Sequence, residues 1–517
     1  MRSTRSNDAI LPASLLCGLL AATLAAADGT GRDDDPVVLS GAMLPELMGR
    51  DLSELRLYRF DGPPQGFVPV PFQLDERLVK VFDAGEPTEF SEAMYDVFGD
   101  EDGTLDADDE LVFYFGDAGG QAPPGAVWPT GAEPLRFEIR AQDPRLDDPE
   151  PDRYLYLFVG SSLPESTSQY VVWDTTVDGD AAGESFLIEY DDRWILGGLR
   201  VSAPCGTGGD LIDRFKGRVT PFPGVFQDEE DWNLTSTYLG GKVGPVRAIR
   251  YVRGARSGVN TVHHDIVYRH AWHRRINLRV HELESTSVYF DGLPINGSVL
   301  VTSQDLSGVA VDGIPDGAIG AEWVDWVLTR TPAGGSVTLF DVPLSPLYAT
   351  REFFYRDDAS YDDTVPGKTG YGDEDDAAYG AYGFTLLDTL DSNLTPIEVG
   401  MQLYPLCSDS GDLTLVADLV ARAGAPIDPT PLPQADCGFI RDLQLTRDVD
   451  DILLSWGTLP EADSYRVYAA GFPELDSGSW TLLSDGPGNT FRDAMAAGLP
   501  DRYYSVVCVD DGGEGPP

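Results

Sequence analysis

The sequence predicts an all-β, multidomain fold built from several β-sandwiches. Segments that alternate apolar and polar residues recur along the chain, and the clearest is LRFEIRA at residues 135–141. Such alternation places the apolar side chains on one face of a strand. The 56 glycines and 38 prolines supply many tight turns between short strands. At about 150 residues per domain, a chain of 517 residues is expected to form about three domains.

The first 27 residues have the pattern of a secretory signal peptide. Arg2 and Arg5 form a positive start, an apolar run follows over residues 9–24, and three alanines end at Ala27. We therefore expect cleavage near Ala27 and secretion to the extracellular space or the cell surface. No other stretch reaches about 18 uninterrupted apolar residues, so we expect no transmembrane segment.

A β-rich N-terminal domain is expected over residues 28–182. Its predicted strands are DELVFYF, LRFEIRA and YLYLFV, of which the last is apolar throughout and is expected to be buried on both faces. The segment EPTEFSEAMYDVF, residues 86–98, is the best candidate for a helix in this domain. The domain is thus predicted to be a sandwich of strands with at most one short helix.

An acidic loop, DEDGTLDADDE at residues 100–110, carries seven carboxylates in eleven residues. Calcium binds several oxygen ligands from flexible loops, so a calcium site is one interpretation. Its ligands would be Asp100, Asp102, Asp106 and Asp108. An EF-hand is excluded because Phe98 falls at the first ligand position. The other interpretation, which we favour, is a solvated hairpin before the strand DELVFYF.

A second β-rich domain is expected over residues 183–424, with INLRV and SVTLF as strands and GDLTLVADLVARAG as a helix near its end. One acidic segment of this domain has carboxylates from Asp357 to Asp376, and these are interleaved with Tyr355, Tyr361, Tyr371, Tyr379 and Tyr382. Tyrosine rings beside carboxylates suit a sugar, because the rings stack on it and the carboxylates accept hydrogen bonds from its hydroxyls. They equally suit an acidic loop, and both interpretations stay open.

Four cysteines follow the signal peptide. They are Cys205, Cys407, Cys437 and Cys508. An even number of cysteines in a secreted chain permits two disulfides, and three pairings are open. Their spacing matches no zinc-binding motif.

Residues 425–437, APIDPTPLPQADC, are predicted to be an extended Pro-rich linker. The last domain, residues 438–517, has short alternating segments at the spacing of a β-sandwich, with Trp456 in its core. Its segments ILLSW, SYRVY and RYYSVVCVDDGGEGPP resemble strands B, C and F of a fibronectin type III domain. Strand G is expected to be missing, because the chain stops at GEGPP. The resemblance implies a spacer or adhesion module, which in exported bacterial proteins often accompanies carbohydrate-active domains.

The chain is strongly acidic, with a formal net charge of −50. A polyanion of this kind is repelled by nucleic acids and by anionic membranes, so neither is an expected partner. The charge suits cations, or a salty exterior in which it is screened.

One basic segment interrupts this acidic chain. Between Lys242 and His281 there are one lysine and eight arginines against the single acid Asp265. Four of the five histidines of the chain lie in HHDIVYRHAWHRR, residues 263–275. If the segment is one extended strand, alternate residues share a face, and one face carries a surface row of cations. The ligand-binding candidates in this row are Arg269, His273, Arg275, Arg279 and His281.

Three interpretations of the basic segment are open. The arginines pair with carboxylates of the same chain, or they bind an anionic glycan through its carboxylates or sulfates, or the segment is the site of a polysaccharide lyase. In a lyase, arginine neutralises a uronate carboxylate while histidine or tyrosine removes the adjacent proton. The catalytic candidates are His263, His264, Tyr268, His270 and Arg274.

The sequence therefore favours an exported recognition or adhesion protein that binds a polysaccharide or a surface component. The alternative is a polysaccharide-degrading enzyme, either a lyase or a glycoside hydrolase, with the basic segment at its site. A cleft that holds two of the histidines with Tyr268 or Arg274 would favour the enzyme, and a flat sheet face would favour binding. Calcium is the one cofactor indicated, an anionic glycan or a cell-surface component is the expected partner, and the oligomeric state stays open.

Overall fold

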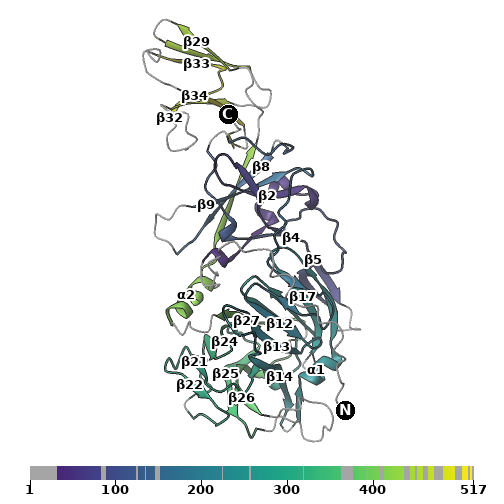
Figure 1. Ribbon diagram of the computed structural model, residues 1–517. Helices are drawn as coiled ribbons and strands as arrows, with labels where there is room; N and C mark the ends of the chain where they lie inside the picture. Colours follow the sequence, from purple (N-terminus) through teal and green to yellow (C-terminus); the bar gives the residue numbers. More distant parts are fainter. Residues whose placement is uncertain are drawn as a thin grey trace, which may run out of the picture.

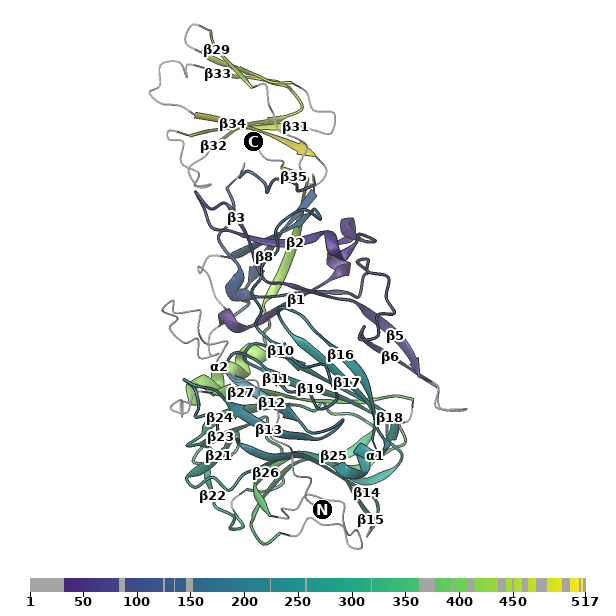
Figure 2. The ribbon, with the colours of Figure 1, turned by 45° about the vertical axis from the view of Figure 1, so that its right-hand side comes forward.

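The computed structural model describes residues 32–517 with several gaps. The predicted signal peptide lies outside the described residues, and so do 83–88, 124–125, 134, 146–151, 224, 256–257, 318, 362–376, 393, 407–412, 436–442, 449–450, 458–463, 471–480, 495–502, 511–512 and 515–517. The predicted all-β fold is confirmed, because antiparallel sheets make up the described chain. Figure 1 and Figure 2 show three β-rich units in a row, with the N-terminal unit between the central unit and the C-terminal unit.

The N-terminal unit is a sandwich of two sheets. One sheet has the strand order β28-β8-β9-β2-β3, with bounds β28 Asp428–Ala435, β8 Leu135–Gln142, β9 Arg153–Val159, β2 Leu55–Phe60 and β3 Phe67–Pro69. The other has the order β1-β7-β4, with bounds β1 Pro36–Ser40, β7 Glu110–Tyr114 and β4 Gln73–Asp75. Both sheets contribute to one core, in which Leu39, Phe113, Ile139 and Leu157 are fully buried. Among the described residues, this unit has five 3-10 helices: η2 Arg32–Asp34, η3 Gly41–Met43, η4 Pro45–Leu47, η5 Leu52–Glu54 and η6 Phe115–Asp117.

The segment 425–437, which we expected to be a free linker, is mostly strand β28. It pairs with β8 along its whole length and forms the edge of the N-terminal sheet. Pro429, Pro431 and Pro433 stand at alternate positions of this strand. Because alternate residues direct their backbone groups to opposite sides, three prolines on the outer edge remove no hydrogen bond to β8. The linker prediction is wrong because the proline pattern also fits an edge strand.

A two-stranded hairpin extends from the N-terminal unit, with β5 Arg77–Phe82 paired to β6 Phe90–Tyr95. The helix predicted over residues 86–98 is therefore wrong. Buried and exposed residues alternate over most of β6, which is the period of a strand. The buried Glu92 hides this alternation in the sequence, because a charged residue occupies a core-facing position.

The central unit contains three sheets. The largest has the order β16-β17-β18-β19-β27-β24-β23-β21-β22, with bounds β16 Thr237–Val243, β17 Ala248–Ala255, β18 Gly258–Val267, β19 Trp272–Leu278, β27 Ile397–Leu406, β24 Gly334–Asp341, β23 Trp326–Thr331, β21 Ser298–Thr302 and β22 Val309–Val311. The second has the order β15-β14-β20-β26-β25, with bounds β15 Val225–Asp228, β14 Ile212–Phe222, β20 Leu283–Gly292, β26 Ala378–Thr389 and β25 Tyr348–Asp358. Side chains of all three sheets share one core, in which Trp194, Trp232 and Trp272 are buried.

The third sheet of the central unit has the order β10-β11-β12-β13, with bounds β10 Val172–Trp173, β11 Ala181–Ala182, β12 Phe186–Tyr190 and β13 Leu196–Val201. Its first two strands precede residue 183, so the central unit begins earlier than the predicted boundary. Two-residue strands carry too few residues to show alternation in the sequence. Two helices complete the unit, α1 Glu229–Thr235 and α2 Leu413–Ala423, and the second confirms the helix predicted near its end.

The C-terminal unit is also a sandwich. One sheet has the order β29-β30-β33, with bounds β29 Gln444–Asp448, β30 Asp451–Ser455 and β33 Thr490–Asp493. The other has the order β32-β31-β34-β35, with bounds β32 Thr481–Gly486, β31 Ser464–Ala470, β34 Tyr503–Asp510 and β35 Gly513–Glu514. Trp456 lies in its core, as predicted. The chain forms the short strand β35 after β34, where we expected no further strand.

Cys205 and Cys508 are each disulfide-bonded. Cys407 and Cys437 lie outside the described residues, so the pairing stays open. Within the described ranges, no helix has the length and apolar character needed to cross a membrane.

Candidate functional site

The basic segment folds as a hairpin and not as one strand. β18 and β19 pair in antiparallel register, with His264 opposite Arg275. The backbone N–H of Tyr268 donates to the carbonyl of Ala271 at 2.8 Å and closes the turn between them. This turn changes which residues share a face, so His264 lies beside Arg275 while His263 points to the other side. The predicted single row of cations is therefore wrong.

One face of the β18–β19 hairpin lies in the core of the central unit. Arg274 and Asp265 form a fully buried bidentate pair, with both N–O distances at 2.7 Å. The His263 ring packs against Trp194 with 4.1 Å between ring centroids, and burial holds the pKa of His263 well below its usual value. His263 cannot contact a polymer from this position, and the side chain of Arg274 is fully buried, so the structure does not bring the five catalytic candidates together.

The opposite face of the hairpin lies under the β5–β6 hairpin of the N-terminal unit. Glu92 of β6 pairs with Arg279 at 2.6 Å and accepts a hydrogen bond from the amide of Asn277. The guanidinium of Arg253 lies 4.7 Å from the ring centroid of Phe82. We expected this whole basic face at the surface, and that expectation is wrong for Arg279, which an earlier part of the chain covers, whereas Arg275 and His281 are exposed.

A second group of charges joins the N-terminal sandwich to the same face of the central sheet. Arg247, just before β17, donates to Asp75 at 2.8 Å and to Glu110 at 2.7 Å. Lys242 also pairs with Asp75, at 2.8 Å, and the Arg247 guanidinium lies 4.7 Å from the ring centroid of Tyr95. Arg247 and Asp75 are fully buried, so these charges hold the two units together and are closed to a large ligand.

The turn of the β18–β19 hairpin contacts the start of the described chain. Arg269 pairs with Asp34 at 3.3 Å and with Glu184. The His270 ring lies 3.4 Å from Asp34 through Nε2 and 3.0 Å from the Ser185 hydroxyl through Nδ1. This pairing of basic residues with carboxylates of the same chain agrees with the first of the three interpretations.

The five predicted ligand-binding residues are therefore dispersed. Arg269 and Arg279 are engaged by carboxylates of this chain, and His281 is exposed just beyond β19. The Arg275 side chain is 56% exposed and lies 3.6 Å from Asp341. Arg275 and His273 are the members of this set that line the cavities described next.

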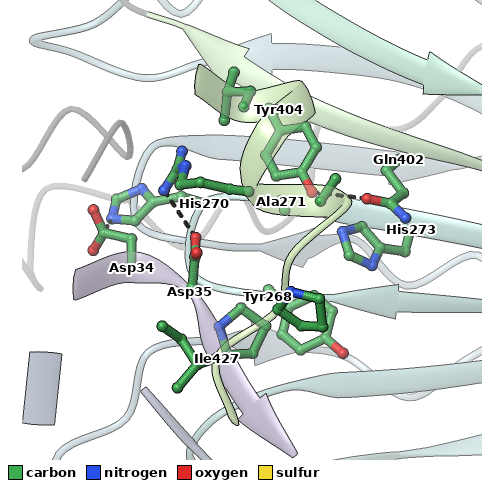
Figure 3. A pocket seen from close by; sticks show the side chains of 14 residues that line it. Asp34, Asp35, Tyr268, His270, Ala271, His273, Gln402, Tyr404 and Ile427 are labelled. Carbon is green, nitrogen blue, oxygen red and sulfur yellow. Dashed lines mark hydrogen bonds and ion pairs between the residues drawn. The ribbon is translucent and has the colours of Figure 1, made fainter. Parts of the chain in front are cut away.

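A cavity of about 170 Å³ lies where the N-terminal segment, the hairpin turn, β27 and helix α2 meet (Figure 3). Two of its walls are the aromatic rings of Tyr268 and Tyr404, and between them lie the polar side chains of Gln402 and His273. The full lining is Asp34, Asp35, Pro36, Tyr268, His270, Ala271, His273, Gln402, Tyr404, Leu419, Arg422, Ala423, Pro426 and Ile427. We call this space the first cavity.

The polar groups of the first cavity are held in place by neighbours. Arg422 of α2 donates to Asp35 at 2.8 Å, and the Tyr404 hydroxyl donates to Oε1 of Gln402 at 2.8 Å, both drawn as dashed lines in Figure 3. Nε2 of His273 is buried and has no hydrogen-bond partner among the described residues. The cavity therefore combines polar groups that neighbours hold in place with the imidazole of His273, which forms part of its wall.

A second cavity, of about 210 Å³, adjoins the first along the same face of the sheet. Tyr268, His273 and Gln402 line both. The other residues of the second cavity are Tyr95, His264, Ile266, Arg274, Arg275, Asp341, Gly400 and Met401. Each cavity holds two histidines beside Tyr268, which meets the geometric criterion that we set for an enzyme.

The histidines of the second cavity are nonetheless weak bases. Burial lowers the pKa of His264 to about 4 and that of His273 to about 3, and the positive charge of Arg275 adds to both effects. Burial also raises the pKa of Tyr268. At neutral pH these side chains donate and accept hydrogen bonds as uncharged groups. A general base works best with a pKa near the operating pH, so this arrangement suits binding better than proton removal.

The acidic loop 100–110 connects β6 to β7, and these two strands do not pair, so it is a loop and not the hairpin that we favoured. Asp102 accepts hydrogen bonds from Thr104, and Asp100 pairs with Lys80 at 2.6 Å. Among the described residues, no three His, Cys, Asp or Glu side chains are grouped so that they could hold a metal ion. The predicted calcium ligands, including Asp106 and Asp108, therefore gain no support.

The acidic segment with interleaved tyrosines serves the fold where it is described. Asp357 is buried and accepts hydrogen bonds from the backbone N–H groups of Gly313 and Gly380. Tyr382 lies in the central core. Residues 362–376 lie outside the described residues, so the sugar-binding interpretation of this segment stays a prediction.

Several residues of the first cavity were missed by sequence reasoning. They are Asp34, Asp35, Gln402, Tyr404 and Arg422. Gln402 and Tyr404 alternate with apolar residues in MQLYPL, which marks a strand, yet no signal connects them to the basic segment. Asp35 and Arg422 are 387 positions apart, and only the fold brings them together.

Comparisons with known proteins identify no family for this chain. No family model and no curated protein matches it. Among solved structures it is similar to a candidate aldose 1-epimerase from Escherichia coli K12, with 10% identity, 46% of this chain and 99% of that chain covered, and a TM-score of 0.24. A copper-containing benzylamine oxidase from Hansenula polymorpha has 8% identity and a TM-score of 0.25, with 67% of this chain and 79% of that chain covered. Domains A168–A170 of titin have 10% identity and a TM-score of 0.13, with 67% of this chain and 96% of that chain covered. Similarities at these TM-scores carry no argument about function.

Proposed function

We propose that this protein is an exported recognition protein that binds a sugar unit of a polysaccharide or of a surface component in the first cavity. One observation carries the proposal: the rings of Tyr268 and Tyr404 and the polar groups of Gln402 and His273 surround a space of about 170 Å³. A space of this size accommodates a single sugar ring and not a folded partner.

The chemistry of these walls matches that of a sugar. A sugar ring has apolar C–H faces that pack on aromatic rings, and hydroxyls that need both donors and acceptors. The amide of Gln402 and the imidazole of His273, which both line the cavity, are polar groups of this kind. Because they are buried and positioned before the ligand arrives, little ordering has to accompany binding.

The charges around the first cavity are already balanced within the chain. Asp35 faces Arg422, and Asp34 faces Arg269 and His270. An anionic glycan would meet no unpaired guanidinium here. We therefore propose a polysaccharide partner but no longer assign its recognition to the row of arginines that the sequence indicated.

Two further features support export and a modular architecture. Cys205 and Cys508 are disulfide-bonded, and disulfides are typical of proteins that leave the reducing cytosol. The C-terminal sandwich of three and four strands is the arrangement expected of a fibronectin type III-like domain. We propose that this unit acts as a spacer or adhesion module beside the sugar-binding unit.

Titration of the full chain with a panel of neutral and anionic polysaccharides tests the proposal. We expect at least one of them to bind, and we expect Tyr404→Ala to weaken that binding by roughly ten-fold or more, as the loss of an aromatic stacking partner does. Tyr404→Phe separates the hydroxyl from the ring, and Tyr503→Ala, at a tyrosine 40% exposed in the C-terminal unit, is the control. Failure of every polysaccharide to bind the folded chain would overturn the proposal.

A polysaccharide-degrading enzyme is the second candidate, because both cavities hold two histidines beside Tyr268. The low pKa values of His264 and His273 count against it, since neutral imidazoles of this kind remove protons poorly. Incubation with uronic-acid polysaccharides, followed by measurement of unsaturated products and of reducing ends, decides between the two. Turnover that His273→Gln abolishes would favour the enzyme, whereas binding without turnover favours recognition.

A further inference from the structure

The second cavity has a hydrogen-bond donor and an acceptor at its edge. Arg275 of β19 and Asp341 of β24 both stand opposite Gly400 of β27, one from each neighbouring strand. Their side chains are 56% and 55% exposed, and their closest polar atoms are 3.6 Å apart. Because Gly400 has no side chain, the guanidinium and the carboxylate approach each other across this strand.

The pair is loose enough to take part in further hydrogen bonds. A separation of 3.6 Å exceeds the usual length of a charge-assisted hydrogen bond, and both groups keep unused donors or acceptors. Adjacent hydroxyls of a sugar each act as donor and acceptor, so one can accept from the guanidinium while its neighbour donates to the carboxylate. The donors and acceptors of this exposed Arg–Asp pair therefore match those of two adjacent hydroxyls.

The two cavities are neighbours. Tyr268, His273 and Gln402 line both, so these side chains separate a ligand in one cavity from a ligand in the other. The second cavity is also slightly larger, at about 210 Å³ against about 170 Å³. This geometry suits a chain of sugar units that runs along the face of β18, β19 and β27.

We infer that the second cavity is a subsite for the neighbouring unit of an uncharged glycan, with Arg275 donating to one hydroxyl and Asp341 accepting from another. The inference rests on the proposed function, because the first cavity holds the first unit. An uncharged glycan is preferred because a carboxylate placed beside Arg275 would also meet the negative charge of Asp341. Selectivity for chain length and for charge thus comes from one pair of side chains.

The test compares disaccharides with their component monosaccharides on the full chain. Cellobiose, maltose, lactose and diacetylchitobiose are titrated by calorimetry beside glucose, galactose and N-acetylglucosamine, with digalacturonate as the acidic probe. We expect one neutral disaccharide to bind at least roughly ten-fold more tightly than its monosaccharide, since hydrogen bonds to charged groups contribute on this scale. Arg275→Gln and Asp341→Asn should each remove most of that gain while leaving monosaccharide affinity unchanged.

A matched control is available in the C-terminal unit. Arg492 and Asp448 form a similarly exposed pair, 50% and 51% exposed, so Arg492→Gln should change neither affinity. Equal affinity for the disaccharide and its monosaccharide, an Arg275→Gln variant that binds both like the wild type, or preference for digalacturonate would each overturn the subsite while the proposed function stands. Absence of binding by every mono- and disaccharide and by every polysaccharide would overturn both.

Discussion

At the scale of single residues, the central core contains a complete ion pair. The Arg274 guanidinium lies 4.5 Å from the ring centroid of Phe215 and forms two hydrogen bonds with Asp265. Burial by itself raises the pKa of Asp265, but the nearby Arg274 more than offsets this and holds the pKa at about 2. The pair stays charged although both side chains are buried, so each partner depends on the other.

Arg274→Met is expected to destabilise the protein by about 3–5 kcal/mol, because it leaves Asp265 as an uncompensated buried charge. Urea unfolding measures this loss, and Arg275→Met, at an exposed position of the same strand, should change the free energy of unfolding by less than about 1 kcal/mol. The double variant Arg274→Met with Asp265→Leu should recover part of the loss, since no charge remains buried. Equal effects at positions 274 and 275 would contradict this account.

Acid should destabilise the folded protein through its buried histidines. His264 and His273 have pKa values of about 4 and about 3 in the folded state, against 6.5 in the unfolded chain. Between these values mainly the unfolded chain binds the protons, so the free energy of unfolding falls as the pH drops from about 6.5 toward 4. Glu229 works in the opposite direction, because burial raises its pKa from 4.5 to about 7, and it offsets part of the loss.

Thermal melting between pH 7 and pH 4 measures this balance. The double variant His264→Gln with His273→Gln should lose less melting temperature on acidification than the wild type, because it has fewer sites that bind protons only when unfolded. His281→Gln is the control, since His281 is exposed. An unchanged acid slope in the double variant would show that these two histidines do not cause it.

At the scale of elements, the β5–β6 hairpin decides how much of the central sheet meets solvent. Its apolar residues pack with Tyr251, Val262 and Ile266 of the sheet in a separate core. Its buried acid, Glu92, stands over Arg279, which is 3% exposed. The hairpin thus supplies both the apolar cover and the counter-charge for one face of the basic segment.

Glu92→Gln is expected to cost about 3 kcal/mol, because Arg279 stays buried without its carboxylate. Hydrogen exchange should show the largest loss of protection in β5 and β6 and in the adjoining part of β19. Glu89→Gln, at an exposed position just before β6, is the matched control and should leave exchange unchanged. Uniform protection across these strands in the Glu92 variant would mean that the ion pair contributes little.

The proline pattern of β28 makes a second prediction at this scale. Thr430 stands opposite Arg140 and between two prolines. Because the prolines face the outer edge of the sheet, the N–H of Thr430 faces β8. Thr430→Pro should remove that hydrogen bond and cost about 1–3 kcal/mol, whereas Pro431→Ala should be nearly neutral. Chemical unfolding of the two variants checks this. A similar loss of unfolding free energy in the two variants would mean that the prolines do not face the outer edge of the sheet.

At the scale of the whole molecule, a net charge of −50 acts against every compact arrangement of the chain. The like charges repel one another, and salt screens this repulsion. Added salt should therefore raise the melting temperature. We expect sodium and calcium at equal ionic strength to give similar midpoints, because no described group of carboxylates is arranged to hold a metal ion. A clearly higher midpoint with calcium would instead support the predicted site at Asp100, Asp102, Asp106 and Asp108.

The sequence by itself determined the fold class and the places of several strands and one helix. Alternation in LRFEIRA predicted β8, the apolar pattern around ILLSW predicted a C-terminal sandwich with Trp456 inside, and GDLTLVADLVARAG predicted α2. These predictions hold because the spacing of apolar residues in a strand or helix, and the residue types of a turn, depend only on near neighbours in the sequence. The pairing of arginines with acids of the same chain was one of three interpretations that the composition left open.

Only the tertiary structure decided which residues meet. The turn at Tyr268 split the basic segment into two strands, the β5–β6 hairpin covered its expected surface, and β28 returned from a predicted linker to the N-terminal sheet. The first cavity likewise unites Asp35 with Arg422, which are 387 positions apart in the sequence. Contacts of this kind depend on sheet order and on the packing of distant elements, and no local period in a sequence encodes them.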